Sequence, residues 1–443
     1  MNVIGAWGRR IGGGLTRHAG ACLAVSLAAH VLAVVTHPTE PLDLTVYRGA
    51  APHVLSGGLY DFAVHTGPPI PLLPFTYPPF AALVFLPLSW VPGPTAIALW
   101  QAVSVAALVV VARCALRLLR PRPDGRDRAL ALLWAAAGLW LEPVRHTLDQ
   151  GQVNLVLGAV VLAGLALPRG ALVRGAAVGL AAAVKLTPAV AGLYLLATRQ
   201  WRAAAWAVAT AAAATAAAWC VAPDASVRYW TVLVTQTRRV GPLWSVRNQS
   251  LRGALARLAG HDGATATALW WAALVLVTAA TGWAVGAAVR RGDRLGILVA
   301  VELYGLLVSP VSWSHHWIWC VPAMIWLAHG PHRRRPVALA AFAAWAAATG
   351  ARLVPLLIRA EDGLPHPDPY PAPLAWPGSV YAVCALLTFA ALASGPVRDS
   401  AAAGDTAPPE DAEPAGDAAP PEDGTSAPGQ ERDARLPLPR DTG

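Results

Sequence analysis

Apolar residues in this chain gather in long runs, which short polar, proline-containing or arginine-rich segments separate. One run, "ALWWAALVLVTAATGWAVGAAV" at 268–289, has the length and apolar character of a helix that crosses a membrane. The pattern predicts an all-α polytopic membrane protein. The expected spans, twelve in all, lie near 19–36, 77–92, 95–117, 129–146, 152–167, 174–198, 203–221, 266–289, 295–311, 313–329, 337–357 and 377–395.

Arginine-rich segments predict which ends of the spans face the cytoplasm. Residues 1–18 carry three arginines before the first apolar run and no clear cleavage site, which favours an uncleaved first helix over a signal peptide. The N-terminus is then cytoplasmic, and 37–75 form the first extracytoplasmic loop. Twelve spans return the C-terminus to the cytoplasm, together with the basic segments 198–202, 290–294 and 329–336.

One basic segment conflicts with this layout. Two full passes between 77 and 117 place the arginine-rich 117–128 outside. If 77–92 and 174–198 are half-spans or re-entrant pieces, that segment returns inside and everything after 200 is unchanged. Prolines in "TYPPF" and "KLTP" make such broken helices plausible, and both arrangements stay open.

The composition changes abruptly near residue 398. Residues 398–443 are acidic and rich in Pro, Ala and Gly, and they contain no aromatic residue. Such a segment buries too little apolar surface to fold, so we expect a disordered cytoplasmic tail after a transmembrane domain at 19–397.

Composition supports the membrane class and limits the partners. Hydrophobic residues make up 56% of the chain and charged residues 13%. The net charge of +9 comes from arginines that fit cytoplasmic loops, so it does not indicate nucleic acid, and membrane lipids are the expected surroundings. The five cysteines are scattered without metal or disulfide spacing.

The stretch "SPVSWSHHWIWC" at 309–320 sets two adjacent histidines among tryptophans at an expected outer membrane surface. The tryptophans, Trp313 among them, can be an interfacial belt. Ionisable groups at span ends that face the bundle more often mark a substrate path, and His315 and His316 can donate hydrogen bonds to an anionic oxygen. A metal site needs further ligands, so none is expected.

Asp43 is the outer carboxylate that best suits a reaction, because it closely follows the first span and precedes Tyr47 and Arg48. The alternative acids are Asp61, Asp149, Asp224, Asp262 and Glu361. Any of them can be a solvated loop acid or a helix cap, and for Asp61 and Asp262 this is the simpler explanation.

Further polar residues stand at the edges of apolar runs, where an unpaired polar group is costly. Amides both donate and accept hydrogen bonds and suit sugar hydroxyls, whereas Lys185, the single lysine of the chain, and Arg48 suit a phosphate. The predicted substrate-binding residues are Tyr47, Arg48, Tyr77, Gln152, Asn154, Lys185, Asn248, Gln249 and Trp313.

A set of motifs in this sequence resembles, in content and in order, the motifs of one known family. "DLTVYRGA", "GGLYDF", "PFTYPPFAALVFLPL", "DQGQVNLVLGAV", "AAAVKLTPAV", "RNQSLRGAL" and "SPVSWSHHWIWCVP" occur in the order found in one family. Between about residues 20 and 330 the chain resembles glycosyltransferase family 87, the polyprenol-phosphate-mannose-dependent α-(1→2) mannosyltransferases.

The resemblance implies a GT-C fold with about twelve transmembrane helices and an extracytoplasmic active site in the cell membrane. The donor would be a polyprenyl-phosphate mannose and the acceptor a lipid-linked glycan, with inversion at the anomeric carbon. The family's aspartate maps onto Asp43 as general base, and its histidine pair maps onto His315 and His316 near the donor phosphate. No cofactor is expected, because the donor is not a nucleotide sugar.

Three alternatives stay open. An arabinofuranosyltransferase with a polyprenyl-phosphate donor would share the architecture. A secondary transporter would explain broken helices but predicts repeat symmetry and paired intramembrane carboxylates. A scaffold protein would leave the outer polar clusters unexplained.

Overall fold

The computed structural model of the protein describes residues 14–66, 72–120, 125–364 and 369–395. The predicted N-terminal segment and acidic tail therefore lie almost entirely outside the described residues. The first half contains α2 (Ala19–Thr36), α3 (Leu42–Ala50), α4 (His53–Ser56), β1 (Ala63–His65), β2 (Leu72–Pro74), α5 (Pro79–Phe85), η1 (Leu86–Trp90), α6 (Gly93–Leu119), α7 (Gly125–Gly138), α8 (Glu142–Gln150), α9 (Asn154–Ala166), α10 (Ala171–Val184), η2 (Thr187–Val190), α11 (Ala191–Ala197) and α12 (Trp201–Val221).

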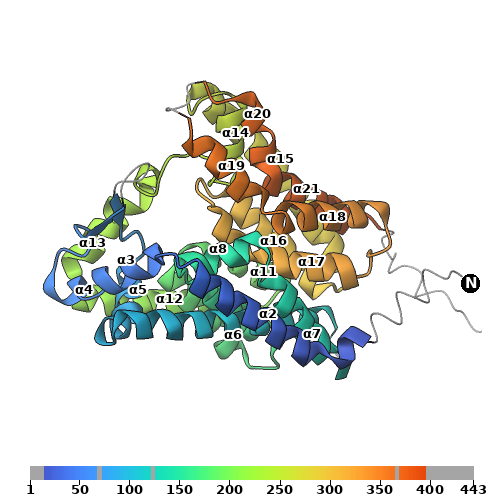
Figure 1. The fold of residues 1–443 in the computed structure, drawn as a ribbon, viewed down its shortest axis with the longest axis horizontal. Helices are drawn as coiled ribbons and strands as arrows, with labels where there is room; N and C mark the ends of the chain where they lie inside the picture. Colours follow the sequence, from blue (N-terminus) through green and yellow to red (C-terminus); the bar gives the residue numbers. More distant parts are fainter. Residues whose placement is uncertain (1–13, 67–71, 121–124, 365–368, 396–443) are drawn as a thin grey trace, which may run out of the picture. The chain divides into compact units, whose positions relative to one another are not determined.

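The second half is also helical (Figure 1). It contains α13 (Pro223–Thr231), η3 (Leu233–Thr235), η4 (Thr237–Arg239), α14 (Leu251–Leu258), α15 (Ala264–Arg290), α16 (Arg294–Val308), η5 (Ser314–Trp319), α17 (Cys320–His329), α18 (Pro336–Gly350), α19 (Leu353–Asp362), α20 (Ala372–Ala375), η6 (Pro377–Ser379) and α21 (Val380–Ala393).

Five helices of the described residues are long and apolar enough to cross a membrane, or up to seven if each of two bent helix pairs is one span. The helical membrane class is thereby supported, while the count of twelve spans stays a prediction. The five helices are α2, α6, α12, α15 and the segment Ala372–Ala393.

Several predicted spans are broken in the structure. The expected span at 129–146 is two elements, since α7 ends at Gly138 and α8 begins at Glu142. The segment 77–92 holds the short α5 and a 3₁₀ turn, and 174–198 is interrupted after Val184. Proline at the first turns of η1, α8 and η2 starts a new helix there, because proline cannot continue the preceding one.

Helix α10 packs closely on α12 through two glycines one turn apart. A Cβ at Gly175 would lie 2.2 Å from the Ala203 carbonyl oxygen, and one at Gly179 would lie 2.2 Å from that of Ala207. Small residues at this spacing let two helix backbones approach, as is common in membrane proteins. Because α10 ends at Val184, this close packing positions the helix that leads to Lys185.

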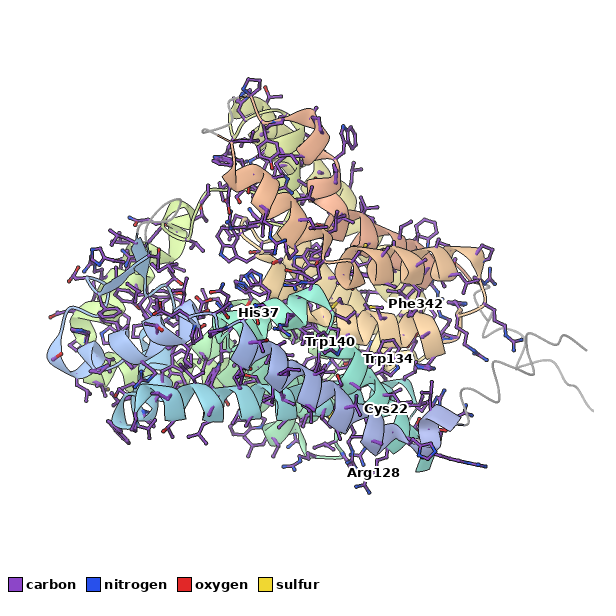
Figure 2. All side chains as sticks on the ribbon, viewed as in Figure 1. Cys22, His37, Arg128, Trp134, Trp140 and Phe342 are labelled. Carbon is purple, nitrogen blue, oxygen red and sulfur yellow. The ribbon has the colours of Figure 1, made fainter. Side chains whose placement is uncertain are left out.

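Two tryptophans, one in α7 and one in the turn that follows it, contact neighbouring helices (Figure 2). Trp140 Nε1 donates to Ser26 Oγ in α2 at 2.9 Å, and Trp134 Nε1 donates to His329 Nε2 in α17 at 2.9 Å. Trp134 also contacts Phe342 of α18 edge to face, with ring centroids 6.5 Å apart. The described residues of the predicted first loop at 37–75 form α3, α4 and the strands β1 and β2, which pair antiparallel with Ala63 opposite Pro74.

Candidate active site

Helix α3 presents Asp43 and Tyr47 one turn apart, so both side chains project from the same face. Tyr47 is fully buried and stacks on Phe85, with ring centroids 4.3 Å apart. The Tyr47 and Tyr77 hydroxyls lie 2.8 Å apart, and each is 3.0 Å from Oε1 of Gln152. A buried hydrogen-bonded cluster therefore lies directly beside Asp43.

A sharp bend between α8 and α9 delivers Gln152 and Asn154 to this cluster. The two helices meet at 118°, and Gly151 between them has a positive φ of 66°. A Cβ at Gly151 would come within 2.6 Å of Leu44 Cβ, so the bend packs tightly on the first turn of α3. Glycine is required both for the left-handed backbone and for the close approach.

Lys185 stands at the break after α10, where its ammonium group reaches three side chains. Nζ lies 2.7 Å from Asn154 Oδ1, 3.4 Å from the Tyr77 hydroxyl and 3.2 Å from His316 Nε2. The side chain is 8% exposed. When Lys185 is charged, its ammonium group only donates, so Nε2 of His316 would then accept from it and the imidazole proton would be on Nδ1.

The histidine pair lies on the 3₁₀ helix η5, anchored through its backbone. The His315 carbonyl oxygen accepts from Thr147 Oγ1 at 2.9 Å and from Asn154 Nδ2 at 3.0 Å. The two imidazole centroids are 4.7 Å apart. Within the described part of the chain, both ring nitrogens of His315 and Nδ1 of His316 are buried without a hydrogen-bond partner. Buried polar nitrogens of this kind favour a ligand, because leaving them unpaired is costly.

The environment of Asp43 changes the pKa of its carboxyl through several effects that act in opposite directions. Burial raises the pKa of its carboxyl above the ordinary value, because desolvation disfavours the charged form. A hydrogen bond with Gln152, and then the charges of Lys185 and His146, lower that pKa in part. The result is a carboxylate that is a stronger base than an exposed aspartate.

His146 and Glu142 belong to the same site but were not among the predicted residues. His146 Nδ1 is 2.7 Å from Ser314 Oγ and 3.5 Å from Glu142 Oε1, and its ring centroid is 5.0 Å from that of His315. The signal in the sequence is a Glu and a His four residues apart in "EPVRHTLDQGQVN", just before the polar motif. This spacing places both on one helix face only once α8 is known to be helical.

Three other predicted residues make structural contacts. Asn248 Nδ2 donates to the Leu243 and Pro310 carbonyl oxygens, and Gln249 Nε2 donates to those of Val246 and Gly378.

Asn248 Oδ1 also accepts from the backbone of Ser312 at 2.9 Å, and a backbone bridge pairs Asn248 with Trp313. The amides therefore hold the loop that precedes the histidines. Arg48 donates to the Leu88 and Val91 carbonyl oxygens and fastens α3 to η1.

The acids that the sequence left as alternatives have other partners or positions. Asp61 pairs with Arg228 at 2.7 Å, Asp262 with Arg252 at 2.5 Å and Asp149 with Arg145 at 3.0 Å.

Glu361 accepts from Ser245 Oγ, Tyr370 and the Val246 backbone, and Asp224 is exposed on the first turn of α13. Among the acids that the sequence analysis considered, Asp43 is the one that bonds to Gln152 and on which the charges of Lys185 and His146 act.

A pocket extends from the polar end of the cluster between α9, η2, α16 and η5. Asn154 and His316 line one part of it, and most of the remaining wall is apolar, with Thr187 and Glu302 as exceptions. The apolar lining residues are Leu157, Gly158, Val161, Pro188, Val190, Gly305, Leu306, Ile318 and Trp319. In the parts of the chain that the structure describes, no three His, Cys, Asp or Glu side chains are grouped to hold a metal ion.

Comparison with known proteins shows which family the sequence matches. The sequence model of glycosyltransferase family 87 matches residues 75–310. No solved structure matches the chain.

Curated relatives match over most of the chain. A polyprenol-phosphate-mannose-dependent α-(1-2)-phosphatidylinositol pentamannoside mannosyltransferase of Mycolicibacterium smegmatis is 41% identical, over 84% of this chain and 90% of the relative. A protein of the same description from Mycobacterium tuberculosis is 40% identical, over 86% and 88%. An α-(1-2)-phosphatidylinositol mannoside mannosyltransferase of M. tuberculosis, also polyprenol-phosphate-mannose-dependent, is 38% identical, over 76% and 83%.

Proposed function

This chain belongs to glycosyltransferase family 87 and is a hexosyltransferase, as its sequence motifs predicted, and from that premise we propose its reaction. The protein transfers mannose from a polyprenyl-phosphate mannose to a lipid-linked acceptor of the phosphatidylinositol mannoside class. The linkage formed is α-(1→2), with inversion, and Asp43 is the general base. The names of the relatives support the donor and acceptor and favour mannose over arabinofuranose.

The observation that carries the proposal is the contact between an acid–amide cluster and a cationic cluster. Gln152 bonds to Asp43, while Asn154, two residues further along the chain, bonds to Lys185. Both amides follow directly after the bend at Gly151. A base and a phosphate-binding cation are thereby held on either side of a short polar segment, as one-step displacement requires.

The step balances without a cofactor. Asp43 removes the proton of the acceptor hydroxyl as its oxygen attacks the anomeric carbon. The bond from that carbon to the phosphate oxygen breaks, and its electron pair leaves with polyprenyl phosphate. The Lys185 ammonium and the Nδ1–H of His316 stabilise the charge that develops on the phosphate. His315 supplies a further donor or acceptor for the sugar, and its backbone contacts to Thr147 and Asn154 hold it in place.

The pocket beside His316 suits the first part of the isoprenoid chain. Its walls are mostly apolar, and Asn154 and His316 mark its polar end. Burial of an apolar chain there would add binding energy that does not depend on the sugar. We propose that the mannose is surrounded by the side chains of Tyr47, Tyr77 and Trp313. The other predicted binding residues hold the backbone of the site in place: Arg48, Asn248 and Gln249.

The site is proposed to face the outside of the cell membrane, with a cytoplasmic N-terminus and with two of the twelve expected spans crossing the membrane only partly. The arginine distribution supports this orientation. The helix breaks near residues 77–92 and 174–198 are the half-spans that would return 117–128 to the cytoplasm. Single-cysteine labelling of 117–128 from either side of the membrane tests this part of the proposal.

The decisive experiment measures transfer of radiolabelled mannose from polyprenyl-phosphate mannose to a phosphatidylinositol mannoside. Asp43→Asn should reduce the rate by about 10²–10⁴-fold, the usual contribution of a positioned base. Asp61→Asn is the matched control, because Asp61 is an exposed acid paired with Arg228. Full activity of a correctly inserted Asp43→Asn protein would contradict the assignment. If the protein uses only the polyprenyl-phosphate arabinofuranose donor, the proposed fold and site stand, but the transferred sugar is arabinofuranose and not mannose.

A further inference from the structure

A second pocket lies beside Tyr77 and shares no lining residue with the pocket that His316 lines. Its wall comes from the segments after α4 and β2 and from the stretch between α13 and η4. Three aromatic and three polar side chains are among its lining residues: Tyr60, Phe75, Tyr229, Thr76, Gln236 and Arg239. An apolar wall with a few polar groups is typical of a ligand-binding site.

Two consecutive glycines of the motif "GGLYDF" bring Tyr60 to this pocket. Helix α4 ends at Ser56, and Gly57 and Gly58 have positive φ angles of 89° and 76°. Glycine adopts this left-handed backbone without steric cost. The chain therefore turns sharply after α4, and Tyr60, two residues later, is 3% exposed.

Direct contacts join the pocket to the proposed active site through Tyr77. The Tyr60 hydroxyl donates to the Tyr77 carbonyl oxygen at 2.8 Å, and the rings of Phe75 and Tyr77 have centroids 5.8 Å apart. On its other side, the Tyr77 hydroxyl lies 3.0 Å from Gln152 Oε1, and Gln152 bonds to Asp43. The wall of the pocket and the cluster around Asp43 therefore share the segment 75–77.

The side chains of the pocket suit a sugar ring. Tyr60 stacks on Tyr229 with ring centroids 5.8 Å apart, which gives aromatic surface for the C–H groups of a sugar. Gln236 is exposed, and its amide can both donate to and accept from hydroxyl groups. Arg239 donates through Nη2 to the Tyr60 carbonyl oxygen at 2.8 Å, while its Nε is buried without a hydrogen-bond partner among the described residues. An unpaired buried donor favours a ligand that carries oxygen acceptors.

We propose that this pocket binds the sugar ring of the acceptor that precedes the ring receiving the new mannose. The inference rests on the proposed function and adds to it a subsite for the acceptor. The bound ring packs on the aromatic side chains, and Gln236 and Arg239 form hydrogen bonds with its hydroxyl groups. The next ring then lies toward Tyr77 and Asp43. No covalent bond changes in this pocket, so its residues select and position the acceptor.

The test uses two neutral acceptors with the full-length protein in lipid nanodiscs, an alkyl mannoside with one ring and an alkyl dimannoside with two. Polyprenyl-phosphate mannose is the donor for both. The wild-type protein should have the higher kcat/KM for the dimannoside. Arg239→Gln should lower that value by at least about tenfold, because it removes a hydrogen bond from a charged group, and should leave the value for the one-ring mannoside within about twofold.

A milder variant and a matched control accompany Arg239→Gln. Gln236→Ala should reduce kcat/KM for the dimannoside by about two- to tenfold, the contribution of a neutral hydrogen bond, and the exposed position of Gln236 makes misfolding no concern. Thr235→Ala is the control, because Thr235 is the exposed neighbour of Gln236, does not line the pocket, and donates its hydroxyl to the Val232 carbonyl oxygen. Its kcat/KM should equal that of the wild type for both acceptors.

Several results would overturn the inference. Equal losses with both neutral acceptors would mean that the variants disturb the fold, and a raised KM for the donor would assign the pocket to the donor. A loss with a phosphatidylinositol mannoside but none with the dimannoside would assign Arg239 to the anionic phosphodiester of the lipid. An unchanged KM for the phosphatidylinositol mannoside in Arg239→Gln would also overturn it, whether or not the wild type accepts alkyl mannosides. Failure of the proposed function looks different, because the wild type would then transfer no mannose to any acceptor, or Asp43→Asn would keep full activity.

Discussion

Replacement of Lys185 by methionine tests the phosphate-binding half of the site most directly. Methionine keeps most of the apolar stem but removes the ammonium, which contacts Asn154, Tyr77 and His316 within 3.4 Å. The side chain is 8% exposed, so its charge acts in a poorly hydrated environment. We expect the protein to insert normally, because the lost contacts are offset by relief from burying a charge.

The size of the effect follows from the contact that the ammonium would make with the donor phosphate. One hydrogen bond to a charged group contributes about 1.5–3 kcal/mol. Loss of one such contact in the transition state lowers kcat/KM by about 10- to 150-fold, at roughly 1.4 kcal/mol for each factor of ten. Lys185→Arg should recover only part of this, since a planar guanidinium does not reproduce the geometry of the ammonium.

The assay is mannose transfer at several donor concentrations, with Arg128→Met as control because Arg128 is exposed on α7 (Figure 2). A double-mutant cycle adds His316→Ala. If Lys185 and His316 act on one phosphate, the double variant loses less activity than the product of the two single losses predicts. Lys185→Met with kcat/KM within about twofold of wild type, in folded protein, would refute the reasoning.

Four further predictions concern the base and the residues that hold the site together. Burial raises the pKa of Asp43, so kcat/KM should fall on acidification at a higher pH than for an ordinary carboxyl, and Asp43→Asn should remove that limb from any residual activity. The same shift means that the ionised form is disfavoured in the fold, so at neutral pH Asp43→Asn should be at least as stable as wild type by thermal unfolding, and a marked loss would contradict this. Gly151→Ala should lower the Tm and the activity together, because alanine is strained by about 1–2 kcal/mol at a left-handed position and would also meet Leu44. Asn248→Ala should lower the unfolding free energy by at least about 2 kcal/mol, since it unpairs buried backbone groups of the loop before the histidines, and an unchanged Tm would count against its structural role.

Local sequence was sufficient to identify the class of protein and several residues of the site. Apolar run length predicted a helical membrane protein, and ordered motifs predicted the family, which the comparisons confirm. Lys185 was conspicuous as the single lysine inside an apolar segment, and Asp43 as an acid close after the first span. Such signals are visible in sequence because a polar group beside an apolar run is costly without a partner.

Local sequence could not separate substrate-facing amides from those that hold the backbone. Asn154 and Asn248 stand in similar motifs, yet Asn154 contacts Lys185 while Asn248 is bonded to loop carbonyls. Local sequence also could not fix the positions of the helix breaks, because the length of an apolar run does not reveal where the segment turns. The bend at Gly151 depends on contact with Leu44, more than a hundred residues earlier in the chain.

The sequence by itself therefore determined the membrane class, the family and the residue types of the site, because these depend on composition and on local patterns. Only the tertiary structure decided which of those residues meet. It brought the bend at Gly151 against α3 and η5 against α8, and it showed His146 and Glu142 beside the histidine pair. The physical reason is that hydrogen bonds and charges act over a few ångströms, and such distances between remote segments exist only after the helices have packed.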